Sequence, residues 1–172
     1  MSLRACAAVL MAVAGLWLAS GTQREKPLVA QAKTDAVRVL ETEVAAHPSD
    51  VGGLQKLAQA YLDAHSPGLA VSMLESAPAD VRQNTKVDHL YARALVAQGR
   101  NQDALVAERR VLAKCALESE QCESYLVASA QHRADILQEL VSMGVDDAQA
   151  NPEASRVAYQ NATREARVAI LQ

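Results

Sequence analysis

Aromatic side chains and helix-breaking residues are scarce in this sequence. Its 172 residues include no Phe, and aromatic residues make up only 3% of the total. Seven Gly and five Pro interrupt the chain. The hydrophobic residues recur at helical rather than alternating spacings, which gives almost no support for β-strands. The composition therefore predicts an all-α protein with a core of aliphatic side chains and alanine, the best helix former.

Basic clusters are also missing. The formal net charge is −3, and residues of both signs are interspersed along the chain. Nucleic acids bind proteins largely through concentrated Lys and Arg side chains facing the phosphates. The sequence contains no such run and no patch of interleaved basic and aromatic residues, so no nucleic-acid partner is predicted.

Catalytic and cofactor motifs are absent as well. The four His residues lie far apart, and none belongs to an H-E-x-x-H or C-x-x-C-H pattern. There is no Gly-rich phosphate loop and no G-x-S-x-G. Acidic neighbours such as Asp146 and Asp147 fall near expected helix ends, where solvated charge is the simplest interpretation. We predict a protein that is not an enzyme, with no catalytic residue, metal or cofactor.

The N-terminal segment is typical of a secretory signal peptide. Residues 1–4 carry a positive charge, residues 5–19 are small or apolar, and Ala19-Ser20-Gly21 offers a cleavage site. We therefore expect a signal peptide over residues 1–21, a linker over 22–26, and export to the periplasm or cell envelope. An uncleaved membrane anchor is the alternative, although the apolar run is shorter than the roughly 20 residues that a spanning helix requires. A buried N-terminal core helix fits the pattern less well.

Two cysteines remain once the signal peptide is removed. In an exported chain, an even pair favours a disulfide between Cys115 and Cys122. Seven residues of continuous helix would separate them by about 10 Å, too far for a bond. The disulfide therefore requires the helix to break between them, for example with Ser119 as an N-cap. Two unpaired thiols are the alternative.

Capping and breaking residues divide the rest of the chain into helices. The first expected helix lies between Pro27 and Pro48, and Asp50 caps the second. The third begins at Ser66-Pro67 and stops at Pro78. Asn84 or Thr85 opens a further helix that ends at Gly99. Asn101 is expected to cap the next.

Alanines recur at an interval of 34 residues along these helices. Ala36, Ala70 and Ala104 form one series, and Ala58 and Ala92 form another. This interval is the length of a tetratricopeptide repeat, a helix–turn–helix unit. Residues 51–84 and 85–118 would be two such units. The first carries Leu54, Leu57, Ala58 and Tyr61 along the family's first-helix pattern, whereas the second has Asp88 and Glu108 where the family has large apolar residues.

The chain thus resembles the tetratricopeptide-repeat family over about residues 35–115. The resemblance implies a short right-handed solenoid of helical hairpins over residues 27–118, in which the five alanines pack at helix crossings. Residues 119–172 show one long apolar pattern and a final helix from Pro152, and we expect these two helices to cap the solenoid. A generic alanine-rich helical bundle is the alternative fold.

In this family the first helix of each unit lines a concave groove. The resemblance places Gln55, Gln59 and Asp63 on that surface in the first unit, and Lys86, His89 and Arg93 in the second. These six side chains are our candidate partner-binding residues, and a solvated polar face is the alternative. The last three share one helix face and could bind an acidic segment or a C-terminal carboxylate, although the Asn residues of the family's carboxylate-binding subset are missing.

We expect a module that binds a protein or peptide, or a membrane-tethered structural subunit. A membrane contact is expected only through an uncleaved N-terminus, and the oligomeric state is left open.

Overall fold

The computed structural model describes residues 28–118 and 122–170 of the chain, and all of the secondary structure there is helical. The predicted all-α class is therefore confirmed. The helices are α2 (Leu28–Ala46), α3 (Val51–Asp63), α4 (Pro67–Ser76), α5 (Ala79–Arg82), α6 (Thr85–Ala97), α7 (Asn101–Leu117), α8 (Ser124–Ser142) and α9 (Pro152–Ile170).

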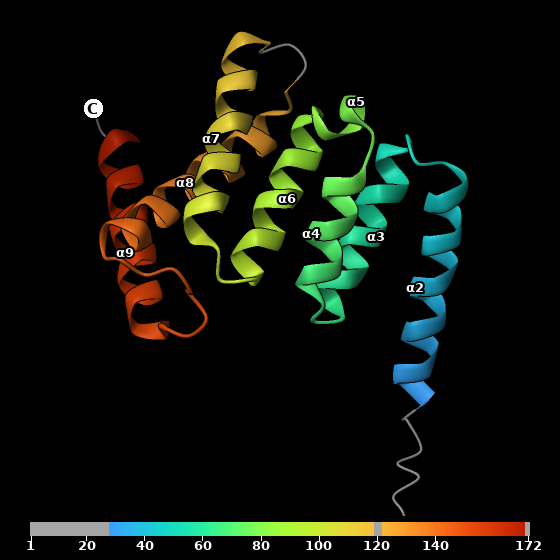
Figure 1. Ribbon diagram of the computed structural model, residues 1–172. Coiled ribbons are helices and arrows are strands. Elements are labelled where there is room, and N and C mark those ends of the chain that lie inside the picture. The colour runs from blue at the N-terminus through green and yellow to red at the C-terminus, as the bar shows by residue number, and fades with distance from the viewer. Residues whose placement is uncertain (1–27, 119–121, 171–172) are drawn as a thin grey trace, which may run out of the picture. The chain divides into compact units, whose positions relative to one another are not determined.

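The chain divides into two units, residues 1–34 and residues 35–172. Of the first unit, only the beginning of α2 is described, so the predicted signal peptide and linker lie outside the described residues. All packing considered below belongs to the second unit. There, from α3 to α9, each long helix packs against its neighbour in the chain order (Figure 1). The predicted apolar positions on α3, namely Leu54, Leu57, Ala58 and Tyr61, are all buried.

Local capping sets the helix starts as the sequence predicts. The carboxylate of Asp50 accepts hydrogen bonds of 3.0 Å from the backbone N–H groups of Gly52 and Gly53. The side chain of Asn84 accepts one from the N–H of Lys86 at 2.9 Å. Both contacts satisfy N–H groups that have no partner in the first helical turn. The short helix α5, between Pro78 and Asn84, was not predicted.

Three of the helices end in the same way. At the ends of α3, α6 and α8, the residue after the C-cap has a positive φ, and these residues are His65, Gly99 and Gly144. In each case the next N–H bonds the carbonyl five residues back: Ser66 to Tyr61, Arg100 to Leu95 and Val145 to Leu140. This is the Schellman termination, which reverses the chain into the following helix. Glycine is needed at position 99 for a second reason, because an added Cβ would lie 2.9 Å from Cγ of Asp147.

Asn101 does not cap α7 as expected. It is the first residue of the helix, is fully buried, and donates from its side-chain amide to the carbonyl of Val145 at 2.9 Å. Its backbone N–H bonds the carbonyl of Asp146. Asn101 therefore joins the α6–α7 turn to the loop that follows α8, a long-range contact that local sequence could not indicate.

Four of the five spaced alanines are fully buried. Ala58, Ala70, Ala92 and Ala104 have no exposed surface and belong to one continuous core. Ala36, which we expected to pack in the same way, is exposed on α2. The opposite side of α2 contacts the core through Val37, Leu40 and Val44. Ala36 faces outward because, among the described residues, no helix precedes α2 to cover that side.

The two cysteines of the second unit lie at bonding distance. α7 ends at Leu117 and α8 begins at Ser124, so the helix breaks between them, as the geometry required. The Cα atoms of Cys115 and Cys122 are 5.5 Å apart and their sulfurs form a disulfide pair. Ser119, the proposed cap, lies outside the described residues.

We predict that neither Cys115 nor Cys122 reacts with a thiol reagent in the native protein before reductant is added. Cys115 is buried, and a bonded sulfur has no thiolate to react. Mass spectrometry of the peptides that contain each residue gives the measurement, with the same protein labelled after reduction and unfolding as the control. Labelling of either residue in the unreduced protein would contradict the bond.

Candidate functional site

The six predicted groove residues line one cavity. Its volume is about 650 Å³, and it is bounded by α3, α6 and the start of α8. Gln55, Gln59 and Asp63 reach it from α3, and Lys86, His89 and Arg93 reach it from α6. Lys56, Ala60, Leu90, Tyr125 and Leu126 complete the lining. We call this cavity the groove. The contribution of α8 was not predicted, because residues 119–172 were expected only to cap the stack.

An ion pair joins Lys86, a residue that lines the groove, to Glu123. Nζ of Lys86 lies 2.7 Å from Oε1 of Glu123, the residue before α8. The hydrogen bond from Lys86 lowers the pKa of Glu123, and the same bond raises the pKa of Lys86. Both side chains are more than a third exposed, at 38% and 49%, so solvent screens the pair. Its main effect is to join the first turn of α6 to the start of α8.

His89, which lines the groove, is held from two sides. Its Nδ1 lies 2.8 Å from Oε2 of Glu108, a residue of α7 with no exposed surface. Its Nε2 lies 3.2 Å from Oγ of Ser129 on α8. Because a carboxylate can only accept, Nδ1 carries a proton and donates to Glu108, while Nε2 and the Ser129 hydroxyl share the second hydrogen bond. Three helices thus fix the orientation of this imidazole.

Two arginines lie one helical turn further along. Arg93 follows His89 on α6, and Arg133 follows Ser129 on α8, each by four residues. A guanidinium nitrogen of Arg133 lies 3.6 Å from Oε1 of Glu108, an ion-pair contact that is too long for a hydrogen bond. Burial lowers the pKa of Arg133; the charge of Glu108 raises it, and the positive charge of Arg93 lowers it again.

The order Ser129–His89–Glu108 is that of a nucleophile, a base and an orienting carboxylate. However, Ser129 lies inside α8, where the neighbouring backbone N–H groups are bonded within the helix. Serine hydrolases also need donors directed at the developing oxyanion, usually backbone N–H groups. The arrangement here favours positioning of His89 as a binding side chain.

A second hollow adjoins the groove and shares three of its residues. It has a volume of about 380 Å³ and is also lined by Gln59, Asp63 and Arg93. Gln59 donates to Oδ1 of Asp63 at 2.8 Å, which fixes both side chains on the exposed face of α3. Arg93 therefore stands between two hollows and can be approached from both.

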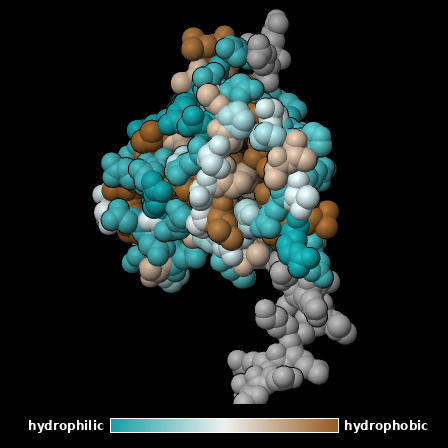
Figure 2. All heavy atoms as spheres, turned by 45° about the vertical axis from the view of Figure 1, so that its right-hand side comes forward, coloured by the Kyte–Doolittle hydropathy of each residue, from teal (hydrophilic) through white to brown (hydrophobic). Residues whose placement is uncertain are grey.

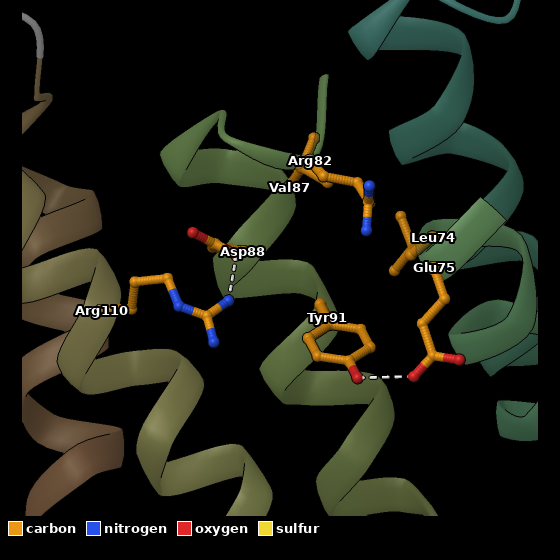
Figure 3. Close-up of a pocket in the computed structure, with 7 residues that line it drawn as sticks. All are labelled: Leu74, Glu75, Arg82, Val87, Asp88, Tyr91 and Arg110. Atoms are coloured by element: carbon orange, nitrogen blue, oxygen red, sulfur yellow. Dashed lines mark hydrogen bonds and ion pairs between the residues drawn. The ribbon is translucent and has the colours of Figure 1, made fainter. Parts of the chain in front are cut away.

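A smaller cavity of about 190 Å³ lies among α4, α5, α6 and α7 (Figure 3). Several of its polar groups are already paired, although Figure 3 shows no hydrogen bond or ion pair between Arg82, on α5, and the other residues drawn. Asp88, which is buried, contacts Arg110 at 3.2 Å and Lys114 at 2.7 Å. The hydroxyl of Tyr91 donates to Glu75 at 2.7 Å, and burial together with this bond raises its pKa to about 12. Because Asp88, Tyr91 and Glu75 are already paired and this cavity is smaller, the groove is the better candidate site.

Comparisons with protein-family models, curated proteins and solved structures give no match. The function of the groove is therefore inferred from its lining residues and their contacts. Within residues 28–118 and 122–170, no helix is both long and apolar enough to span a membrane. The same residues bring together no group of three or more potential metal ligands.

The sequence analysis missed Glu123, Glu108 and Ser129, which contact the groove residues Lys86 and His89, and Arg133, which contacts Glu108. One signal was available for Glu108, because an acidic residue occupied a position where the 34-residue pattern expects an aromatic one. A carboxylate at such a position requires charged partners in the core. For Ser129 and Arg133 there was no comparable signal, since their part depends on α8 lying beside α6.

Proposed function

We propose that this chain is a non-enzymatic interaction module that binds a protein or peptide in the groove of a short tetratricopeptide-like solenoid. The observation that carries the proposal is that all six residues expected on the concave face line one cavity. They come from two helices whose starts, at residues 51 and 85, are 34 residues apart.

Repetition of local structure supports the solenoid part of the proposal. α4 and α7 also begin 34 residues apart, and the turns before them share the Schellman termination. The end of α8 has the same termination, and Asn161 of α9 donates back to Glu139 of α8 at 2.9 Å. We propose that α8 and α9 form a third, diverged hairpin with a longer turn. The right-handed stacking of the pairs is part of this proposal.

The surface fits a polar binding mode. On the face shown in Figure 2, hydrophilic residues predominate and hydrophobic residues form separate patches. A module of this kind would present pre-organised side chains over a shallow groove, which lowers the ordering cost of binding. Ion pairs across the helices, such as Lys86 with Glu123, supply that order.

We place the module in the cell envelope after export, on the basis of the apolar segment at residues 5–19 and the paired cysteines. The alternative is a membrane-tethered structural subunit of an envelope assembly, in which the same segment stays uncleaved. Sequencing the N-terminus of the mature protein separates the two, because a start near residue 22 excludes the tether.

Photo-crosslinking in the native cells tests the groove. A photoreactive amino acid replaces Gln59 in the groove or, as the control, the exposed Gln102 on α7. We expect a defined crosslinked product from position 59, none from position 102, and loss of the product when Lys86 and Arg93 are both changed to Ala. Equal products from both positions, or a product that persists in the double variant, would refute groove binding.

A further inference from the structure

The cavity among α4, α5, α6 and α7 has an apolar side and a polar side. Leu74 of α4 and Val87 of α6 form the apolar side, and each has only 2% of its surface exposed. Both belong to the continuous core, so packing fixes their positions. The described lining of this cavity has no residue in common with the described lining of the groove, so its ligand is a separate question from the proposed function.

Two arginines form the polar side. Figure 3 shows the guanidinium groups of Arg82, from α5, and Arg110, from α7, pointing into the cavity, with the ring of Tyr91 below them. One nitrogen of Arg110 lies 3.2 Å from Asp88, and a guanidinium has further N–H donors for another acceptor. Among the residues that the structure describes, no ion pair or side-chain hydrogen bond includes Arg82. Both guanidinium groups can therefore donate to a molecule in the cavity.

The charges around the cavity leave a surplus of one positive charge. The buried carboxylate of Asp88 contacts Arg110 with one oxygen and Lys114 with the other, at 2.7 Å. The other acidic residue of the lining, Glu75, already accepts a hydrogen bond from a tyrosine hydroxyl. Two carboxylates thus stand against three cations, which are Arg82, Arg110 and Lys114. A ligand with a single negative charge would neutralise the surplus.

The volume and the apolar side of the cavity limit the nature of this anion. The volume is about 190 Å³, and an apolar cavity of about 150 Å³ is large enough to hold benzene. A molecule of similar size could place its apolar body against Leu74, Val87 and the ring of Tyr91. Its carboxylate would accept charge-assisted hydrogen bonds from the two guanidinium groups. An inorganic anion would gain nothing from the apolar side chains, so the lining favours an organic acid.

We propose that this cavity binds a small organic monocarboxylate, whose charge is held by Arg82 and Arg110 and whose apolar body lies on Leu74 and Val87. The ligand would join α4 and α5 to α6 and α7, and so would stabilise the contact between two successive helical hairpins. Local sequence could not indicate the site, because the short helix that carries Arg82 was not predicted. This inference goes beyond the proposed function, and each can hold without the other.

Benzoate and benzamide are a matched pair of probes for this site, because they have nearly the same shape and only benzoate is charged. We expect benzoate to shift the methyl NMR resonances of Leu74 and Val87 in a saturable way, since its ring would lie against these methyl groups. The methyl groups of Leu90 and Leu126, which line the groove, are the internal control and should not shift. Benzamide should bind about tenfold more weakly or worse, as it lacks the charge that strengthens the hydrogen bonds.

Replacing Arg82 by Gln tests the guanidinium group. Arg82 is exposed, so Arg82→Gln should keep the fold. We expect this variant to bind benzoate about tenfold more weakly or worse, because one charge-assisted contact is lost. Arg93→Gln removes a cation from the groove instead, and as the matched control it should leave benzoate binding unchanged.

The results distinguish a site in this cavity from one in the groove. Saturable shifts at Leu74 and Val87 that Arg82→Gln weakens and Arg93→Gln leaves unchanged support the inference. It is overturned if these shifts are absent, if benzoate and benzamide bind equally, or if benzoate binding survives Arg82→Gln. Shifts confined to Leu90 and Leu126 also overturn it, since they would place the carboxylate in the groove. The crosslinking at position 59 tests the proposed function independently of all these results.

Discussion

Replacing Glu108 by Ala should lower the free energy of unfolding by about 3–5 kcal/mol, the usual cost of removing one member of a buried ion pair. Glu108 has no exposed surface and contacts both His89 and Arg133. Without the carboxylate, Arg133 keeps its charge with little water around it, since only 27% of its side chain is exposed. The shortened side chain also leaves a cavity at the contact of α6, α7 and α8.

Chemical denaturation of the wild type and the variant measures this loss. Glu118→Ala is the matched control, because Glu118 lies on the same chain segment just after α7 but is exposed, and it should change stability by no more than about 0.5 kcal/mol. Glu108→Gln should fall between the two, as the amide keeps the volume and one acceptor. If Glu108→Ala is no worse than the control, the buried cluster contributes nothing to the fold.

Enlarging the buried alanines should also destabilise the protein. We expect Ala70→Leu and Ala104→Leu each to lower the free energy of unfolding by about 1–3 kcal/mol, because three extra carbons must fit where two helices touch. Both residues have no exposed surface, and they begin the inward faces of α4 and α7 at equivalent positions. The two sites lie in different hairpins, so their effects should be nearly additive in the double variant.

Thermal melts of the two single variants, the double variant and Ala113→Leu give the comparison. Ala113 lies on α7 but is exposed, so a larger side chain there meets no neighbour and should have little effect. If both core substitutions leave the melting temperature unchanged, the alanines do not mark helix crossings and the 34-residue register is wrong.

Helix positions were largely predictable because they depend on local chemistry. Asp50 and Asn84 cap α3 and α6 with their own side chains, Pro67 and Pro152 begin helices, and Gly99 ends one. The break that lets Cys115 reach Cys122 also followed from helix geometry alone. Asn101 was misassigned as a cap because its amide bonds a carbonyl 44 residues away, which no local rule can anticipate.

The sequence predicted the side chains that α3 and α6 contribute to the groove, but not those that α8 contributes. The helical period placed Lys86, His89 and Arg93 on one face of α6, and the 34-residue spacing matched that face to α3. The remaining wall depends on α8, whose start does not follow the 34-residue interval. Sequence reasoning therefore found Lys86, His89 and Arg93, but it found neither Lys56 nor the carboxylate of Glu108 that contacts His89.

Sequence by itself predicted the long helices, most of their starts and ends, and the polar face of α6, and it favoured the pairing of the cysteines, since each depends on residues within a few turns of one another. Only the tertiary structure decided that Glu108 and Asp88 are buried with cationic partners, that Ala36 is exposed, and that Ser129 contacts His89. The physical reason is that burial and charge compensation depend on contacts between distant helices, and these form only when the helices pack together.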